Sequence, residues 1–135
     1  MSGRIGGYNS GVANLAASTG RVLLVTAAGG GGSGTVAVSA AAGAVRPIGI
    51  LKDAENVAGG VVSVVEDGYA FAFAGGALTV AATTSVGSDA NGAVVAIAPG
   101  AGVWAVGYFS PENGTDSAAG DMTRIIVDPH FVALS

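Results

Sequence analysis

The chain has 135 residues, enough for one domain but too few for two, and 50% of them are hydrophobic. Only 10% are charged, the net charge is -4 and the basic residues are scattered singly, which argues against nucleic-acid binding, while the lack of cysteine excludes disulfides and thiolate metal sites. Because low-charge surfaces promote association, we expect part of this surface to be covered by copies of the chain or by a larger assembly.

Residues 1–20 are predicted to form an extended N-terminal arm, followed by a single β domain over residues 21–135. The arm is too rich in glycine to nucleate a helix and too short to bury a core of its own. Tyr8 is an isolated aromatic residue with no core within the chain to join, so we expect it to anchor on a partner. The other arm residues expected at an interface are Arg4, Ile5, Asn9, Val12 and Leu15.

Three short strands are predicted next. Arg21–Thr26 is a run of aliphatic and β-branched residues that ends before the glycine-rich stretch Gly29–Gly34. Thr35–Ser39 alternates with a period of two, as a half-buried strand does. Val45–Leu51 contains Pro47, which cannot donate to a strand ladder, so this strand starts late or lies at an edge of the sheet.

A β-hairpin is predicted over Gly60–Phe73, because Glu66-Asp67-Gly68 places an Asp-Gly turn between two strand-like runs. In the second run every other residue from Tyr69 to Phe73 is aromatic, and alanines fill the positions between them. The aromatic face is expected to meet the core. The alanine face is expected to allow close approach of a neighbouring sheet or subunit.

The rest of the chain is predicted as further short strands. In chain order they are a hairpin over Thr83–Ile97 with its turn at Asp89–Gly92, the strand Val103–Phe109, the polar loop Ser110–Asp121 and a closing strand Met122–Asp128 ended by Pro129. Helical periodicity is almost absent. These spacings predict an all-β fold, a small single-domain barrel or sandwich of roughly eight to ten strands.

No segment is predicted to cross a membrane or to direct export. The uncharged stretches Val22 to Val45 and Gly68 to Ser88 are interrupted by glycine and diluted by alanine, serine and threonine. The first residues lack the continuous apolar core of a signal peptide. We therefore expect a soluble protein that is made in a cytoplasm and not exported.

No cofactor or metal site is expected. The run Gly29–Gly34 follows a strand as a dinucleotide-binding loop would, but the next element is a second strand and not a helix that could receive a pyrophosphate. Asp89–Gly92 is similar to the start of a calcium loop, yet Ala93–Gly100 lacks the carboxylate that would complete it. A flexible loop and a hairpin turn explain the two segments better.

Catalysis is not expected either, so the protein is predicted not to be an enzyme. His130 is the only histidine, and the nearby sequence offers no nucleophile together with an orienting partner. Glu66 and Asp67 are adjacent and would point to opposite faces of a strand, which makes them a poor acid–base pair.

Two roles are open for Trp104. Its apolar neighbours Val103, Ala105 and Val106 favour a position in the core. Tryptophan is also among the commonest anchors of protein interfaces, so Trp104 is a candidate for partner binding as well.

Five segments rich in glycine and small aliphatic residues keep a fixed order along the chain. They are Pro47-Ile48-Gly49-Ile50-Leu51, Gly60-Val61-Val62-Ser63-Val64 with Gly68, Ala74-Gly75-Gly76-Ala77-Leu78, Ser88-Asp89-Ala90-Asn91-Gly92 and Val106-Gly107-Tyr108. In this order and spacing they resemble the capsid decoration (cement, or head-stabilising) proteins of tailed bacteriophages. The sequence departs from that family at Ala81–Gly87, where the usual acidic residue is missing, and in the longer loops Gly29–Gly34 and Ser110–Asp121.

The resemblance implies a compact β domain of the tulip or small-barrel kind that binds the outer surface of an expanded icosahedral phage head. Such proteins commonly bind as trimers at local three-fold axes and bridge adjacent subunits of the major capsid protein, which stabilises the head. The expected partners are therefore the major capsid protein and further copies of the chain. The arm is expected to add as a strand to an exposed sheet edge of the shell protein.

Two other function classes stay open. One is a receptor- or glycan-binding module on the surface of a virion, which would need exposed Trp or Tyr, whereas Trp104 lies in an apolar strand. The other is a self-assembling β structural protein, since strands rich in Ala, Gly and Val can stack. An enzyme built on a small β-barrel is disfavoured by the lone His130 and the isolated acidic residues.

Overall fold

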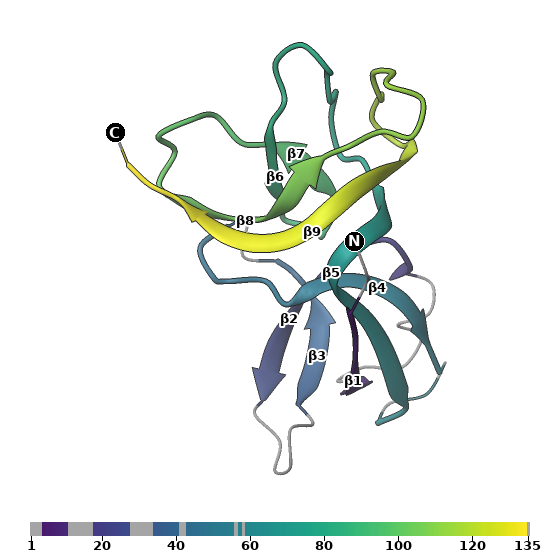
Figure 1. Ribbon diagram of the computed structural model, residues 1–135. Helices are drawn as coiled ribbons and strands as arrows, with labels where there is room; N and C mark the ends of the chain where they lie inside the picture. Colours follow the sequence, from purple (N-terminus) through teal and green to yellow (C-terminus); the bar gives the residue numbers. More distant parts are fainter. Residues whose placement is uncertain are drawn as a thin grey trace.

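The computed structural model describes residues 4–10, 18–27, 34–40, 43–55, 57 and 59–134. These residues form nine β-strands and no α-helix (Figure 1). The strands are β1 (Arg4–Ser10), β2 (Val22–Ala27), β3 (Thr35–Val38), β4 (Gly49–Ala54), β5 (Val61–Phe73), β6 (Ser85–Ser88), β7 (Val94–Ala96), β8 (Val103–Phe109) and β9 (Met122–Val132). No helix among the described residues is long and apolar enough to cross a membrane.

The strands form one curled, half-barrel sheet. Its order is β1-β3-β2-β4-β5-β9-β8-β6-β7, and β1 also pairs with β5. The pair β1–β3 is parallel, and all other neighbouring strands are antiparallel. The long strand β5 belongs to both halves, and Figure 1 shows β2 and β3 on one side of β9 and β6 and β7 on the other. The predicted all-β class is confirmed, and nine strands lie within the predicted number.

Most of the predicted strands are present near their expected bounds. The segments after Gly20 and after the glycine run form β2 and β3, and β4 begins at Gly49, two residues after Pro47. The hairpin β6–β7 is also confirmed. Its turn is held by Asp89, whose Oδ1 accepts hydrogen bonds from the backbone N–H groups of Asn91 (2.8 Å) and Ala93 (3.0 Å).

The predicted hairpin at Glu66-Asp67-Gly68 is wrong, because β5 runs without a turn from Val61 to Phe73. Gly68 has the positive φ of a turn residue, 86°, but the strand continues on both sides of it. Residues before Gly68 pair with β4 and β1, and residues from Gly68 onward pair with β9. Gly68 is therefore the corner at which β5 passes from one half of the sheet to the other.

The prediction that Pro129 ends the last strand is also wrong, since β9 continues to Val132. The last residue of β9 that pairs with β5 is Val127, opposite Gly68. Beyond it β9 pairs only with β8, through a register shift between Ala105 and Gly107. Pro129 thus lies where β9 has no second neighbouring strand among the described residues, and its missing N–H costs no ladder hydrogen bond to such a strand.

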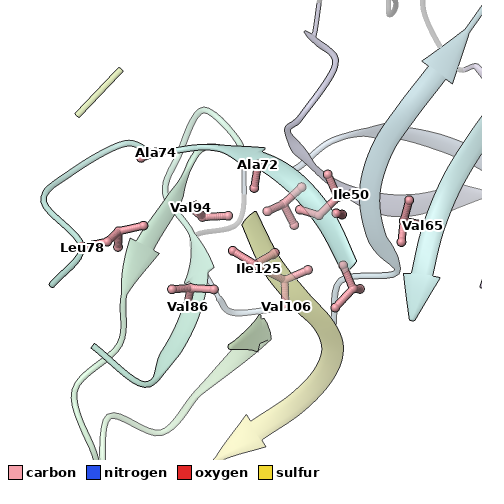
Figure 2. Packing of buried hydrophobic residues seen from close by; sticks show 12 residues of the cluster. Ile50, Val65, Ala72, Ala74, Leu78, Val86, Val94, Val106 and Ile125 are labelled. Carbon is pink, nitrogen blue, oxygen red and sulfur yellow. The ribbon is translucent and has the colours of Figure 1, made fainter. Parts of the chain in front are cut away.

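Two clusters of buried apolar residues form the interior. The larger is built from Val22 of β2 and from residues of β4 to β9 and of the segment between β5 and β6. Figure 2 shows Leu78, Val86, Val94 and Ile125 of this cluster around a common centre. The smaller consists of Leu23, Val36, Leu51, Val62 and Val64. Burial of each Val, Leu or Ile side chain stabilises the fold by about 1.5–3 kcal/mol, so these clusters are a main source of stability.

The aromatic and alanine faces of β5 are the reverse of the prediction. Ala70 and Ala72 are buried in the larger cluster, whereas Tyr69 and Phe71 are about half exposed on the outside. The branched side chains of the other strands already fill the interior of the curled sheet (Figure 2). Room is therefore left for methyl groups on β5, and the rings are placed outside.

The structure gives no support to a free arm at the N-terminus. Arg4–Ser10 form β1, which pairs antiparallel with β5 and, at its end, parallel with β3. Tyr8 packs against the smaller cluster, and its hydroxyl donates a 2.6 Å hydrogen bond to Glu66 Oε1. The premise that Tyr8 has no core within the chain to join is therefore wrong. The rest of the predicted arm from Gly11 to Ala17 lies outside the described residues.

Candidate interaction surfaces

The outer side of β5 and β9 carries an exposed apolar surface, which we call the Phe71 face. Tyr69, Phe71 and Met122 are 49%, 52% and 50% exposed. They come together because β5 and β9 pair with Phe71 opposite Arg124 and with Phe73 opposite Met122. Large apolar side chains gathered in this way on the outside of a sheet are typical of interaction sites.

Two arginine side chains lie on the rings of this surface. The guanidinium carbon of Arg124 is 4.2 Å from the centre of the Tyr69 ring, and that of Arg21 is 4.6 Å from the centre of the Phe73 ring. Each arginine is also fixed by a backbone carbonyl: Arg124 Nε donates to Ser110 O (2.9 Å) and Arg21 Nη1 to Asn91 O (2.8 Å). The surface is therefore apolar and cationic together, with its charges held in place.

Hollows lie on both sides of Phe71 and Met122, which line each of them. One hollow, of about 270 Å³, is mainly apolar and has Lys52 at its edge together with Ile50, Val65 and Tyr69. The other, of about 280 Å³, is polar and acidic, with Glu112, Asp116 and Asp121 in its lining. Phe71 and Met122 thus form a ridge between a basic apolar side and an acidic side.

A second exposed aromatic group, the Trp104 patch, consists of Arg46, Trp104 and Phe131. Trp104 and Phe131 are opposite each other on β8 and β9, with ring centres 5.4 Å apart in an edge-to-face arrangement. The Arg46 guanidinium carbon lies 5.7 Å from the centre of the Trp104 ring. Phe131 is 50% exposed. Trp104 is partly buried and belongs to neither core cluster, so the expected core position is not found.

His130 has hydrogen-bond and stacking partners that could not be identified from the neighbouring sequence. Ser85 Oγ lies 3.0 Å from His130 Nε2, and Nδ1 lies 2.7 Å from the carbonyl oxygen of Asp128. Because a carbonyl can only accept, Nδ1 donates to it, and in the neutral imidazole Nε2 then accepts from the Ser85 hydroxyl. The imidazole also stacks on Tyr108, with ring centres 4.5 Å apart. Ser85 comes from β6, 45 residues away in sequence, which is why the pairing was missed.

This serine–histidine pair does not make a catalytic site by geometry alone. A hydrolase would also need donors for an oxyanion and a cleft for the substrate. Ser85 is the first residue of β6, and its carbonyl already accepts from the N–H of Ile97. Neither Ser85 nor His130 lines the two hollows beside Phe71 or the hollow at the β6–β7 turn. The hydrogen bonds and the stacking fix β9 to β6 across β8.

A third hollow, of about 750 Å³, lies between the β6–β7 turn and the ends of β2, β3 and β5. Its lining includes the polar side chains of Arg21, Asp89 and Asn91, and two serines. Arg21 and Asp89 are already engaged with backbone groups of the turn, so they serve to hold the turn against Phe73. No group of three or more potential metal ligands occurs among the described residues.

The residues predicted from sequence to contact partners are not gathered in one place. Arg4, Ile5, Tyr8 and Asn9 all lie on β1, where the backbone pairs with β5. Trp104 lies on β8. Val12 and Leu15 lie outside the described residues.

Sequence reasoning missed the Phe71 face, although its signal was present. The alternation of aromatic residues and alanines over Tyr69–Phe73 was recognised, but the wrong face was assigned to the core. Alanine is buried about as often as the aromatics, so alternation alone does not say which face is inside. No protein-family model matches this chain, and no curated protein matches it in sequence.

Proposed function

We propose that the protein is a structural component of a virion that binds the outside of an expanded icosahedral phage head and bridges adjacent major capsid protein subunits. The observation that carries the proposal is the presence of two separate exposed aromatic surfaces, the Phe71 face and the Trp104 patch, on a protein of low charge. A bridging protein needs at least two interfaces. The resemblance of its five glycine-rich segments to capsid decoration proteins supplies the identity of the shell.

The Trp104 patch is the surface we assign to the shell protein. It combines Trp, Phe and Arg, and tryptophan and arginine dominate the energetic centres of interfaces. Val45, which precedes Arg46, and Leu134, three residues after Phe131, are themselves 50% and 79% exposed. Residues 1–20, with Arg4, Ile5, Asn9, Val12 and Leu15, are proposed to add contacts at the same or a neighbouring capsid subunit.

The finer features of the proposal are a β-tulip fold and a homotrimer on the head. The strands β3-β2-β4-β5 are neighbours in the sheet, and β1 pairs with both outer strands of this set, β3 and β5. This closure supports a tulip-like end of the domain. Several modest contacts made by one oligomer become effectively intramolecular, so weak single contacts can give tight attachment. Catalysis forms no part of the proposed role.

Glycan binding is a second function with which exposed aromatic rings are compatible. Sugar recognition would use the open face of an aromatic ring. Arg124 covers the ring of Tyr69 and Arg46 lies over the ring of Trp104, which leaves less of either face for stacking. The arginine-covered rings favour a protein surface as the partner.

The proposal is tested by adding the purified protein to heads of the parent phage that lack it. Expanded heads and unexpanded precursor shells are each mixed with the protein and sedimented, and the bound copies are counted. Saturable binding to expanded heads alone is expected. Binding to neither kind of shell would overturn the proposal and leave a receptor-binding or self-assembling role.

A matched pair of variants assigns the surface. Phe131→Ser removes the exposed ring of the Trp104 patch and is expected to weaken binding to expanded heads by about 30-fold or more. Val80→Ser changes a side chain of equal exposure, 50%, in the segment between β5 and β6 and is expected to bind as the wild type does. Equal binding of the two variants would exclude the Trp104 patch as the contact.

A further inference from the structure

We infer that a second copy of the chain binds the Phe71 face about a two-fold axis, with each Phe71 entering the apolar hollow of its partner. This inference goes beyond the proposed function, because it concerns a contact between copies that needs no capsid. It rests on three properties of the face: a protruding ring beside a hollow, opposite charges on the two sides of the ridge, and the area exposed.

The first property is the combination of a ring and a hollow side by side. Phe71 is 52% exposed and lines the apolar hollow of about 270 Å³ next to it. If a two-fold axis passes between the ring and the hollow, the Phe71 ring of each copy lies against the apolar hollow of the other copy. Such reciprocal contacts are what an interface with two-fold symmetry requires. An aromatic ring in an apolar pocket is also the usual energetic centre of an interface.

The second property is the arrangement of charge across the ridge. Lys52 is exposed at the edge of the apolar hollow, and Glu112 lies on the opposite side of Phe71 and Met122. The same two-fold axis carries the acidic side of one copy over the basic side of the other. Lys52 of each copy then faces the acidic hollow of its partner, in which Asp116 adds further negative charge. The face is thus complementary to itself, which favours a second copy over an unrelated surface.

The third property is the exposed area. Tyr69, Phe71 and Met122 are about half exposed, and with a full area of about 200 Å² each they offer about 300 Å² of mostly apolar surface. A stable interface buries about 800 Å² on each partner. The two hollows and the Ser110–Asp121 loop must supply the remainder, so we expect a dissociation constant in the micromolar range.

Sedimentation equilibrium of the full chain, at concentrations far above this dissociation constant, tests the inference. The wild type is expected to have twice the mass of the Phe71→Ser variant, whether the latter is a monomer or a larger oligomer formed through another surface. Val61→Ser, at a 57% exposed position in the other half of β5, is the control and is expected to keep the wild-type mass. Equal masses for the wild type and Phe71→Ser would overturn the inference. Because Phe71 is half exposed, the variant is expected to fold, and far-UV circular dichroism verifies this.

A charge exchange tests the two-fold geometry itself. Lys52→Glu and Glu112→Lys each place like charges across the axis and are expected to weaken the self-association by about tenfold. The double variant restores opposite charges and is expected to associate about as tightly as the wild type. A double variant no tighter than either single variant would overturn the assigned pairing. If the wild type self-associates but does not bind expanded heads, the result counts against the proposed function and not against this inference.

Discussion

Phe71 and Ala72 are adjacent on β5, yet Phe71 is 52% exposed and Ala72 is completely buried. Ala72 lies among the branched side chains of the larger core cluster, and Phe71 stands on the outer surface opposite Arg124 (Figure 2 shows Ala72 in the interior). The relation between these two neighbours decides which side of the sheet can meet a partner.

We therefore expect opposite stability effects from the two positions. Ala72→Leu should lower the free energy of unfolding by about 1–3 kcal/mol, because the interior has no room for three more carbon atoms. Phe71→Ala should change it by less than about 1 kcal/mol, since about half of the ring is already exposed to solvent. Urea unfolding of the two variants measures both. A larger loss for Phe71→Ala than for Ala72→Leu would contradict the assigned faces.

Gly107 is predicted to be among the least replaceable glycines. A Cβ atom at this position would lie within van der Waals overlap of Ile126 O and near Asp128 N, both backbone atoms of β9. Gly107→Ala should lower the free energy of unfolding by about 3 kcal/mol or more, because β8 and β9 would have to separate. Gly76→Ala is the control: its nearest neighbour would be Val95 Cγ1 at 3.9 Å, so little change is expected in the same unfolding assay.

The hydrogen bond from Tyr8 to Glu66 predicts how firmly β1 is held. Tyr8→Phe removes the 2.6 Å contact to a carboxylate and should lower the free energy of unfolding by about 1–2 kcal/mol. Amide hydrogen exchange of Gly6 and Tyr8 should also be slowed in the wild type, since these residues lie opposite Val64 and Val62 in the sheet. Exchange at the rate of an unstructured chain would show instead that the segment is a free arm in solution.

Asp89 is expected to contribute to stability through the β6–β7 turn. Asp89→Ala removes the acceptor for the N–H groups of Asn91 and Ala93 and should cost about 1–2 kcal/mol. Asp89→Asn keeps an acceptor oxygen and should lose less. Thermal unfolding of the two variants compares them. An equal loss for both would mean that the charge of Asp89, and not its capping of the turn, is the important property.

Most of the strands could be predicted from sequence because their signals are local. The Asp89–Gly92 turn, the effect of Pro47 on the start of β4 and the run Val103–Phe109 each depend on residues that are neighbours in the chain. The structural roles of Gly68 and Pro129 could not be predicted from neighbouring residues. Whether an Asp-Gly pair makes a turn or a corner depends on what pairs with β5, and whether proline ends β9 depends on whether a strand lies beside it.

The candidate surfaces were predicted only in part, for the same reason. Trp104 was identified as a possible anchor from its residue type, but its contacts with Arg46 and Phe131 come from distant segments. The pairing of Ser85 with His130 and the packing of Tyr8 on the smaller cluster are likewise long-range. Such contacts follow from the topology of the sheet, which no local pattern specifies.

The central claim, that the protein stabilises an expanded head by bridging capsid subunits, is tested most directly by the heat stability of the heads. Expanded heads are heated alone, with saturating wild-type protein and with Phe131→Ser, and the temperature at which they break is measured by light scattering. We expect the wild type to raise this temperature and Phe131→Ser to raise it much less at the same concentration. An unchanged breaking temperature with the wild type bound at saturation would contradict the account.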